Sequence, residues 1–325
     1  MIYRRLGLLV VLAALAVGAS GCYWLQFRFG PDHTGYNASE NRVGLGNVST
    51  LTQAWTGHTG GVIGASPSIA NGVAYVNSFD NKLYAFDSAG NTNCSGIPKT
   101  CLPLWTATIG GGGSSPAIAN GVVYIVGSGF SGDILFAFDA TGATNCAATP
   151  KTCLPLWSAA LGGTGSASVT VANGVVYTGA DFGPSNGVFA AFDASGITNC
   201  SGSPKTCSPL WTATTGAGVD SSAAVANGVV YVGSIDENVY AFDATGTTNC
   251  SGSPKKCSPL WTGRTGGRVL SSPAVTNGVV YVGSEDHNLY ALMQRERQIA
   301  RARPRAVHHY GPPPPEVRSE IRRRL

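Results

Sequence analysis

The feature that most constrains this chain is a unit of about 50 residues that occurs five times in tandem. Tryptophan marks the phase of the unit, and successive members of the set are separated by 50, 52, 54 and 50 residues: Trp55, Trp105, Trp157, Trp211 and Trp261. An Asn-Gly pair also recurs once per unit, at 71–72, 120–121, 173–174, 227–228 and 277–278. A chain with such a period is expected to form one supersecondary element per repeat and to stack these elements on one another.

Each unit divides into four short strand patterns. In the fourth unit, small residues at 223–226 precede Asn227-Gly228, and this dipeptide is a strong signal for a two-residue hairpin. A nearly continuous apolar run follows at 229–233, then a third strand at 239–242 and a fourth at 260–262. Four short antiparallel strands per unit indicate a propeller blade, whereas solenoid repeats are usually shorter and parallel. The predicted fold class is therefore all-β, a β-propeller of five repeats with four-stranded antiparallel blades.

The two ends of the repeat region suggest how the ring closes. The fifth unit has three strand patterns, between 272 and 292, and lacks a Trp strand, while Leu51–Thr56 is a Trp strand with no blade of its own. Adding this strand to the last blade would close the ring and remove its open edges. The alternative is a chain truncated near Leu292, because the composition changes abruptly there. The predicted domains are a signal peptide at 1–22, a lead-in segment at 23–50, the propeller at 51–293 and a disordered Arg/Pro-rich tail at 294–325.

Composition and charge fit this organisation. The 44 glycines and a charged fraction of only 12% are typical of an all-β fold with many turns. The net charge of +4 comes from the tail, whose nine Arg and three Glu contribute +6, so the remainder carries 12 basic and 14 acidic residues, or −2. A nearly neutral repeat body gives no electrostatic reason to expect a nucleic-acid partner.

The N-terminus has the pattern of an export signal. Arg4 and Arg5 precede an apolar stretch at 6–17 that is too short to span a bilayer comfortably. Ala19-Ser20-Gly21-Cys22 then resembles a bacterial lipobox, although Leu is more usual at the first position. This resemblance implies a lipid anchor on Cys22 and a location in the bacterial cell envelope, at a membrane surface. Ordinary signal cleavage and an uncleaved anchor are the alternatives.

Cysteine usage independently supports export. Eight of the nine cysteines form four C-x6-C pairs: Cys94/Cys101, Cys146/Cys153, Cys200/Cys207 and Cys250/Cys257. Zinc sites usually have a closer spacing and further His or Cys nearby, so four local disulfides are the better interpretation. Each would stabilise the fold by roughly 2–3 kcal/mol in an oxidising compartment. Cys22 is the unpaired ninth cysteine.

The units resemble the pyrroloquinoline-quinone (PQQ) repeat propellers. The resemblance covers roughly residues 24–292 and rests on the run at 272–284, on Leu-Tyr-Ala-Phe-Asp at 83–87 and on the Trp strand. The opening at 24–37 also resembles the lead-in of that family. The group includes quinoprotein alcohol dehydrogenases and a non-enzymatic lipoprotein of the outer-membrane barrel-assembly machine. The dehydrogenases use adjacent cysteines, a Trp stacked on the quinone and bound Ca²⁺, and this chain has no Cys-Cys dipeptide.

Few residues suggest chemistry. Carboxylates in the turns after the second strand, Asp80, Asp236, Glu285 and Asp286, are explained by turn capping, with a weak Ca²⁺ or sugar site as the alternative. His58 and His287 would become neighbours if the ring closes as predicted. The same turn is longer in the second and third units, at 128–133 and 180–187. Its residues Phe130, Asp133, Asp181 and Phe182 are the candidate partner surface.

These observations predict a binding or scaffold propeller with protein partners and no catalytic, cofactor or metal residues. An active site usually breaks the symmetry of repeats, and the units are nearly identical in most of their turns. The alternative is a PQQ- or Ca²⁺-dependent oxidoreductase of the quinoprotein type.

Overall fold

The computed structural model describes residues 23–293, except 34, 36, 130, 131, 166 and 183–185. The predicted signal peptide, Cys22, the tail and Phe130 lie outside the described residues. Within them, no helix has the length and apolar character needed to cross a bilayer.

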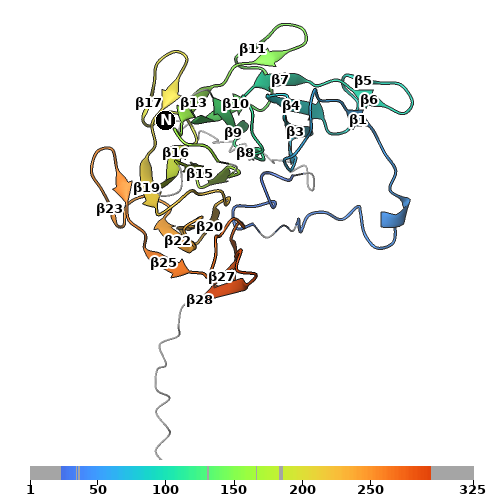
Figure 1. The fold of residues 1–325 in the computed structure, drawn as a ribbon. Coiled ribbons are helices and arrows are strands. Elements are labelled where there is room, and N and C mark those ends of the chain that lie inside the picture. Colours follow the sequence, from blue (N-terminus) through green and yellow to red (C-terminus); the bar gives the residue numbers. More distant parts are fainter. Residues whose placement is uncertain are drawn as a thin grey trace, which may run out of the picture. The chain divides into compact units, whose positions relative to one another are not determined.

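The described chain forms four blades of four strands and a fifth blade of three, and the prediction of an all-β repeat fold is confirmed (Figure 1). Blade 1 contains β2 (Ser68–Ala70), β3 (Val73–Ser78), β4 (Lys82–Asp87) and β7 (Trp105–Thr108); blade 2 contains β8 (Ala117–Ala119), β9 (Val122–Gly129), β10 (Gly132–Asp139) and β13 (Trp157–Ala160). Blade 3 contains β14 (Thr170–Ala172), β15 (Val175–Asp181), β16 (Gly187–Asp193) and β19 (Trp211–Thr215); blade 4 contains β20 (Ala224–Ala226), β21 (Val229–Gly233), β22 (Asn238–Asp243) and β25 (Trp261–Arg264). Blade 5 contains β26 (Ala274–Thr276), β27 (Val279–Gly283) and β28 (Leu289–Met293).

The Asn-Gly pairs form the first hairpin of every blade. Both residues have positive φ, for example 50° at Asn120 and 76° at Gly121, as a type I′ turn requires. This turn fixes the register of the inner strand on its neighbour, with Ala119 opposite Val122 in blade 2. The apolar residues of the second strand are then buried from both sides, because successive blades pack face to face.

Consecutive blades are joined by the same contacts each time. The hydroxyl of a Tyr in the second strand donates to a backbone carbonyl of the next blade at 2.8 Å, from Tyr75 to Ala140, Tyr124 to Ala194 and Tyr177 to Ala244. A ladder of serines also links the starts of the inner strands. Its four rungs of 3.0–3.1 Å run from each backbone N–H to the next serine hydroxyl, through Ser66, Ser115, Ser168, Ser222 and Ser272.

The predicted disulfides are confirmed as four identical hairpins (Figure 1). The hairpins are β5 (Cys94–Ser95) with β6 (Thr100–Cys101), β11 (Cys146–Ala147) with β12 (Thr152–Cys153), β17 (Cys200–Ser201) with β18 (Thr206–Cys207), and β23 (Cys250–Ser251) with β24 (Lys256–Cys257). The second strand of each hairpin pairs in parallel with the Trp strand that precedes it, for example β12 with β7 and β24 with β19. Three of the four hairpins therefore extend the sheet of the preceding blade, and the first, β5–β6, forms a three-stranded sheet with β1 (Thr56–Gly57).

The predicted closure of the last blade is wrong in this structure. Among the described strands, Leu51–Thr56 does not pair with β28. β1 (Thr56–Gly57) pairs in parallel with β6, with Thr56 opposite Thr100. The N–H of Thr56 donates to the Lys99 carbonyl at 3.0 Å. The Trp55 strand thus takes the usual place of a Trp strand beside its disulfide hairpin, and β28 has no outer neighbour among the described residues. Preceding the Trp55 strand, a 3-10 turn, η1, spans Val48–Thr50.

Candidate functional site

The lead-in segment runs across the inner strands of all five blades. One backbone N–H from each inner strand donates to it: Ile69 to the Trp24 carbonyl, Ile118 to Leu25, Val171 to the Gln26 side chain, Val225 to Pro31 and Val275 to Asp32, at 2.6–3.3 Å. Since an inner strand has no neighbouring strand on its free edge, these donors would otherwise lack a protein partner. Residues 24–33 therefore act as a shared sixth element that completes five sheets at once; we call them the axial segment.

Two polar side chains of the axial segment are buried. Gln26 is 4% exposed, and its Oε1 accepts the N–H of Val171 at 2.9 Å. His33 is 1% exposed, and its Nδ1 lies 3.2 Å from the Pro273 carbonyl of blade 5. Burial lowers the pKa of His33 to about 4, and the nearby Arg28 charge acts in the same direction. The imidazole is thus neutral at neutral pH and ties blade 5 to the start of the chain.

The axial segment is a functional element that sequence reasoning did not anticipate in this form. The lead-in was recognised from its resemblance, but four of its five contacts use backbone carbonyls, which carry no signature in the residue types. Buried Gln26 and His33 beside apolar neighbours were the available signal, because such side chains are buried only when they are hydrogen-bonded.

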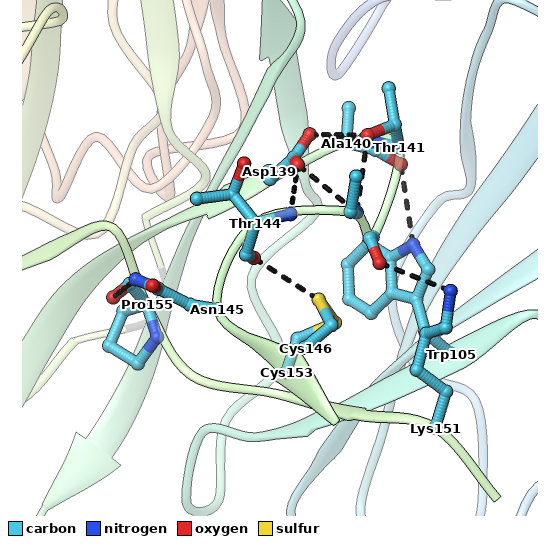
Figure 2. Close-up of a disulfide and its surroundings, with 12 residues drawn as sticks. Trp105, Asp139, Ala140, Thr141, Thr144, Asn145, Cys146, Lys151, Cys153 and Pro155 are labelled. Atoms are coloured by element: carbon cyan, nitrogen blue, oxygen red, sulfur yellow. Dashed lines mark hydrogen bonds between the residues drawn. A yellow bond between two sulfur atoms is a disulfide. The ribbon is translucent and has the colours of Figure 1, made fainter. Parts of the chain in front are cut away.

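At the disulfide end of the blades, one arrangement repeats four times, and Figure 2 shows it at the Cys146–Cys153 loop. The Asp139 carboxylate accepts the N–H groups of Thr141, Ala143 and Thr144 and shapes the turn that follows the third strand. Gly142 in this turn has a φ of 65°, and a Cβ there would overlap the indole of Trp105 from the preceding repeat. We call this end of the blades the collar. In each of its four units it comprises the turn after the third strand, the disulfide hairpin and the Trp of the preceding repeat.

The collar also organises charge. Lys151 extends from the disulfide loop and donates to the Gly142 carbonyl at 3.2 Å, as Figure 2 shows. Lys99, Lys205 and Lys255 make the same bond at 2.8–3.1 Å. The backbone hydrogen bonds that the turn carboxylates accept hold their pKa values low despite the opposing effect of burial, and that of Asp193 falls to about 2. Structural roles thus account for the lysines and carboxylates of the collar.

The opposite end of the blades is where the repeats differ. The hairpin β9–β10 has eight residue pairs and β15–β16 has seven, whereas β3–β4 has six and the equivalent hairpins of blades 4 and 5 have five. The linker before each long hairpin binds along it through the isolated bridges Gly111–Ser128 and Thr164–Asp181. We call the ends of β9–β10 and β15–β16 the long-hairpin surface.

The candidate residues of this surface differ in access. Phe182 is 45% exposed, and Asp181 is half-buried. Asp133 is only 2% exposed, so its side chain supports the hairpin from within. Burial raises the pKa of Asp133, the neighbouring Asp220 charge adds to this effect, and the Ser128 hydroxyl that donates at 3.0 Å opposes it.

The turn carboxylates of blades 1, 4 and 5 have a structural role. Asp236 accepts the Tyr240 hydroxyl at 2.6 Å and the Gly216 N–H at 2.6 Å, and so ties its turn to the linker of the preceding blade. Asp286 does the same with Tyr290 and Gly266, and Asp80 with Tyr84 and Gly60. In blades 2 and 3 the position of the Tyr is taken by Phe136 and Ala190, and the long hairpins replace this strut.

The described residues contain no group of three or more His, Cys, Asp or Glu side chains arranged to hold a metal ion. The closure that would bring His58 and His287 together is not made among the described strands, because β28 and the Trp55 strand belong to separate sheets. The eight cysteines of the blades are joined in the collar disulfides, and the rings of Trp105, Trp157 and Trp211, each 1–2% exposed, pack between blades.

One part of the repeat region matches a family model of known proteins. Residues 201–300 match the PQQ-repeat model described as outer membrane protein assembly factor BamB. The repeats form a PQQ-type β-propeller. No curated protein sequence matches the chain.

Solved structures share the fold of this PQQ-type propeller. BamB from Moraxella catarrhalis is 16% identical, with a TM-score of 0.51 over 74% of this chain and 61% of its own. Quinohemoprotein alcohol dehydrogenase from Comamonas testosteroni is 15% identical, with a TM-score of 0.57 over 83% of this chain and 47% of its own. A europium-containing methanol dehydrogenase is 16% identical, with a TM-score of 0.57 over 84% and 58%. The chain spans 47–61% of the length of these structures, and at such identity the likeness is one of fold.

Proposed function

We propose that this PQQ-type propeller is a non-catalytic lipoprotein of the bacterial cell envelope that serves as a binding platform for protein partners. The observation that carries the proposal is the contrast between the two ends of the blades. The collar is repeated almost unchanged, while the other end departs from the repeat only in blades 2 and 3, where the hairpins are longest. Protruding loops on a rigid scaffold are the usual location of a binding surface.

The form of the long-hairpin surface suits a protein partner. The paired strands and the linker bridges hold the described backbone of these hairpins in place. Phe182 offers an exposed aromatic ring beside the half-buried Asp181, and aromatic anchors are enriched in protein interfaces. The axial segment fills the free edges of the inner strands, which leaves the blade ends for partner contacts.

The proposed location rests on the N-terminal pattern and on the match to an outer membrane protein assembly factor. Export explains the four disulfides, since such bonds persist in oxidising compartments. A lipid on Cys22 would place the lead-in, and with it the propeller, at a membrane surface. Labelling with radioactive palmitate tests the anchor: we expect incorporation in the wild type and none in Cys22→Ser.

Site-specific photo-crosslinking in the native envelope tests the platform. A photoreactive amino acid at Phe182 is expected to give a defined crosslinked band. The matched control is Ile197, which is 75% exposed and lies in the collar. Bands of equal intensity from both positions, or none from Phe182, would refute the long-hairpin surface as the partner site.

The alternative function is a PQQ- or Ca²⁺-dependent oxidoreductase, which two of the similar structures favour by their names. It predicts a visible absorbance change and a higher melting temperature when PQQ and Ca²⁺ are added to the purified protein. We expect neither, because the chain has no Cys-Cys dipeptide and its described residues contain no group of three or more His, Cys, Asp or Glu side chains that could hold a metal ion. A saturable rise in melting temperature would establish the alternative.

A further inference from the structure

The outer edge of β28 lacks a partner strand among the described residues, and the other four blades show how such a strand would pair. In each of those blades, an Ala of the third strand lies opposite the Trp of the outer strand, as Ala241 lies opposite Trp261. The carbonyl of that Ala accepts the N–H of the residue before the Trp at 2.7 Å, with Leu104, Leu156, Leu210 and Leu260 as donors. The equivalent residue of blade 5 is Ala291, and its strand has no outer neighbour among the described residues.

Blade 5 also has an apolar face that no described blade covers. Leu289 is 75% exposed, whereas its equivalents Leu83 and Val239 are fully buried, at 0%, in clusters with residues of the blade that follows. Met293, at the end of the same strand, is 65% exposed. No charged residue and no Pro occurs in Leu289–Met293, although natural edge strands usually carry such residues to prevent association.

The Trp55 strand, residues 51–57, is of the kind that pairs with a third strand such as β28. We call the pairing of these two strands the junction. The relation of the Trp55 strand to the following disulfide hairpin is that of every other Trp strand, and its indole lies over Gly90 as that of Trp105 lies over Gly142. Yet its other edge, where the third strand of a blade belongs, is unpaired among the described strands. The segment 51–57 is also free of charge and of Pro.

We propose that the open edge of β28 binds the Trp55 strand of a second copy of this chain. The repeats set the register: Trp55 lies opposite Ala291, Thr56 opposite Tyr290, and the N–H of Ala54 donates to the Ala291 carbonyl. Both edges are open in the same molecule among the described strands, so a second copy completes the junction without rearrangement of either blade. The bond of Thr56 to Lys99 is kept, as Thr106 keeps its bond to Lys151 while β7 pairs with β4. Two copies can each supply one strand and one edge, which gives a closed dimer.

Two backbone substitutions test the junction from its two sides. In β28 the N–H and carbonyl of Ala291 point away from β27, as those of Ala241 do in blade 4, so Ala291→Pro blocks the edge without removing a bond inside the blade. Ala54→Pro removes the donor from the strand. The mass of the full chain is measured in detergent by light scattering after size exclusion. We expect a dimer for the wild type and a monomer for each variant.

The decisive measurement is complementation. An equimolar mixture of Ala291→Pro and Ala54→Pro is expected to recover dimers, because each partner keeps the half that the other lacks. Recovery excludes closure within one chain, since neither variant contains an intact junction. A monomeric wild type, or a mixture that stays monomeric while the wild type is dimeric, overturns the proposal.

A second variant covers the case in which proline disrupts blade 5. Leu289→Lys leaves the backbone unchanged and places a charge on the face of blade 5 that the first blade of the second copy would cover, so it is expected to be monomeric with an unchanged circular dichroism spectrum. Its matched control is Ile97→Lys on a disulfide hairpin, where the native side chain is fully exposed. We expect this control to remain dimeric, and equal masses for the two variants would refute the role of the edge.

Discussion

His33 allows a sharp test of the axial segment through pH. Its pKa falls from 6.5 to about 4 in the folded protein because the ring is buried, although the Pro273 carbonyl that it contacts acts in the opposite direction. As the pH falls, His33 is therefore protonated near pH 6.5 in the unfolded chain but only near pH 4 in the folded protein. The stability that depends on neutral His33 is complete above pH 6.5 and is lost as the pH falls between these values.

The size of this effect follows from the two pKa values. Between pH 7.5 and pH 5 the wild type should lose about 2 kcal/mol of its free energy of unfolding through His33 alone. Urea denaturation at the two pH values measures the change. Carboxylates with lowered pKa values, such as Asp193 at about 2, lose their stabilising effect only below pH 4 and stay outside this range.

The matched variant is His33→Asn. Residue 33 has a φ of 58°, which Asn tolerates well, and its amide can donate to the Pro273 carbonyl in place of the imidazole. Asn does not titrate, so this variant should lose about 2 kcal/mol less than the wild type over the same interval. Asp133 has a raised pKa and so contributes to the pH dependence of the free energy of unfolding in the direction opposite to His33. This contribution is common to both proteins and cancels when their pH dependences are subtracted. Equal pH dependence in the two proteins would refute the burial of His33 against blade 5.

Three further predictions concern the axial segment and the collar. Gln26→Ala should lower the free energy of unfolding by about 1–3 kcal/mol, because a buried N–H of blade 3 loses its acceptor, and hydrogen exchange should show that amide deprotected. Replacing both Cys146 and Cys153 with Ser should cost about 2–3 kcal/mol in urea denaturation, the loop-closure value for a separation of 7 residues. Gly142→Ala should lower the melting temperature clearly more than Gly121→Ala; both residues have positive φ, but only the first would place its Cβ in an indole ring.

The blades were predictable because each strand boundary has a local chemical cause. Asn120-Gly121 tolerates positive φ at both positions, and the apolar run that follows can only be buried on both faces. The disulfides were predictable for a similar reason, since the separation of 7 residues between Cys146 and Cys153 brings both to one short hairpin. The repeat period and the cysteine spacing can be read from residues that are close in sequence, and these two patterns were enough to predict the fold class.

The candidate site was less predictable because it depends on contacts between distant segments. The carbonyls of Trp24 and Leu25 bind inner strands whatever their side chains, so no residue type marks them. Asp133 was predicted for a partner surface from the length of its loop, but its burial depends on the linker at 161–165, which belongs to the boundary with the next blade. Counting strands likewise suggested a closed ring, and it could not show that β28 and the Trp55 strand belong to separate sheets.

The two ends of the propeller blades are thus under different physical constraints. At the collar, four Trp side chains each fit a glycine of the next repeat, and each disulfide hairpin pairs with the Trp strand that precedes it, so a change in one unit disturbs two. At the other end, the Asp–Tyr strut of blades 1, 4 and 5 can be replaced by a longer hairpin that its own linker supports, as in blades 2 and 3. Loops can therefore lengthen at this end without loss of packing between blades, and this makes the long-hairpin surface the part of the fold that is free to acquire a partner.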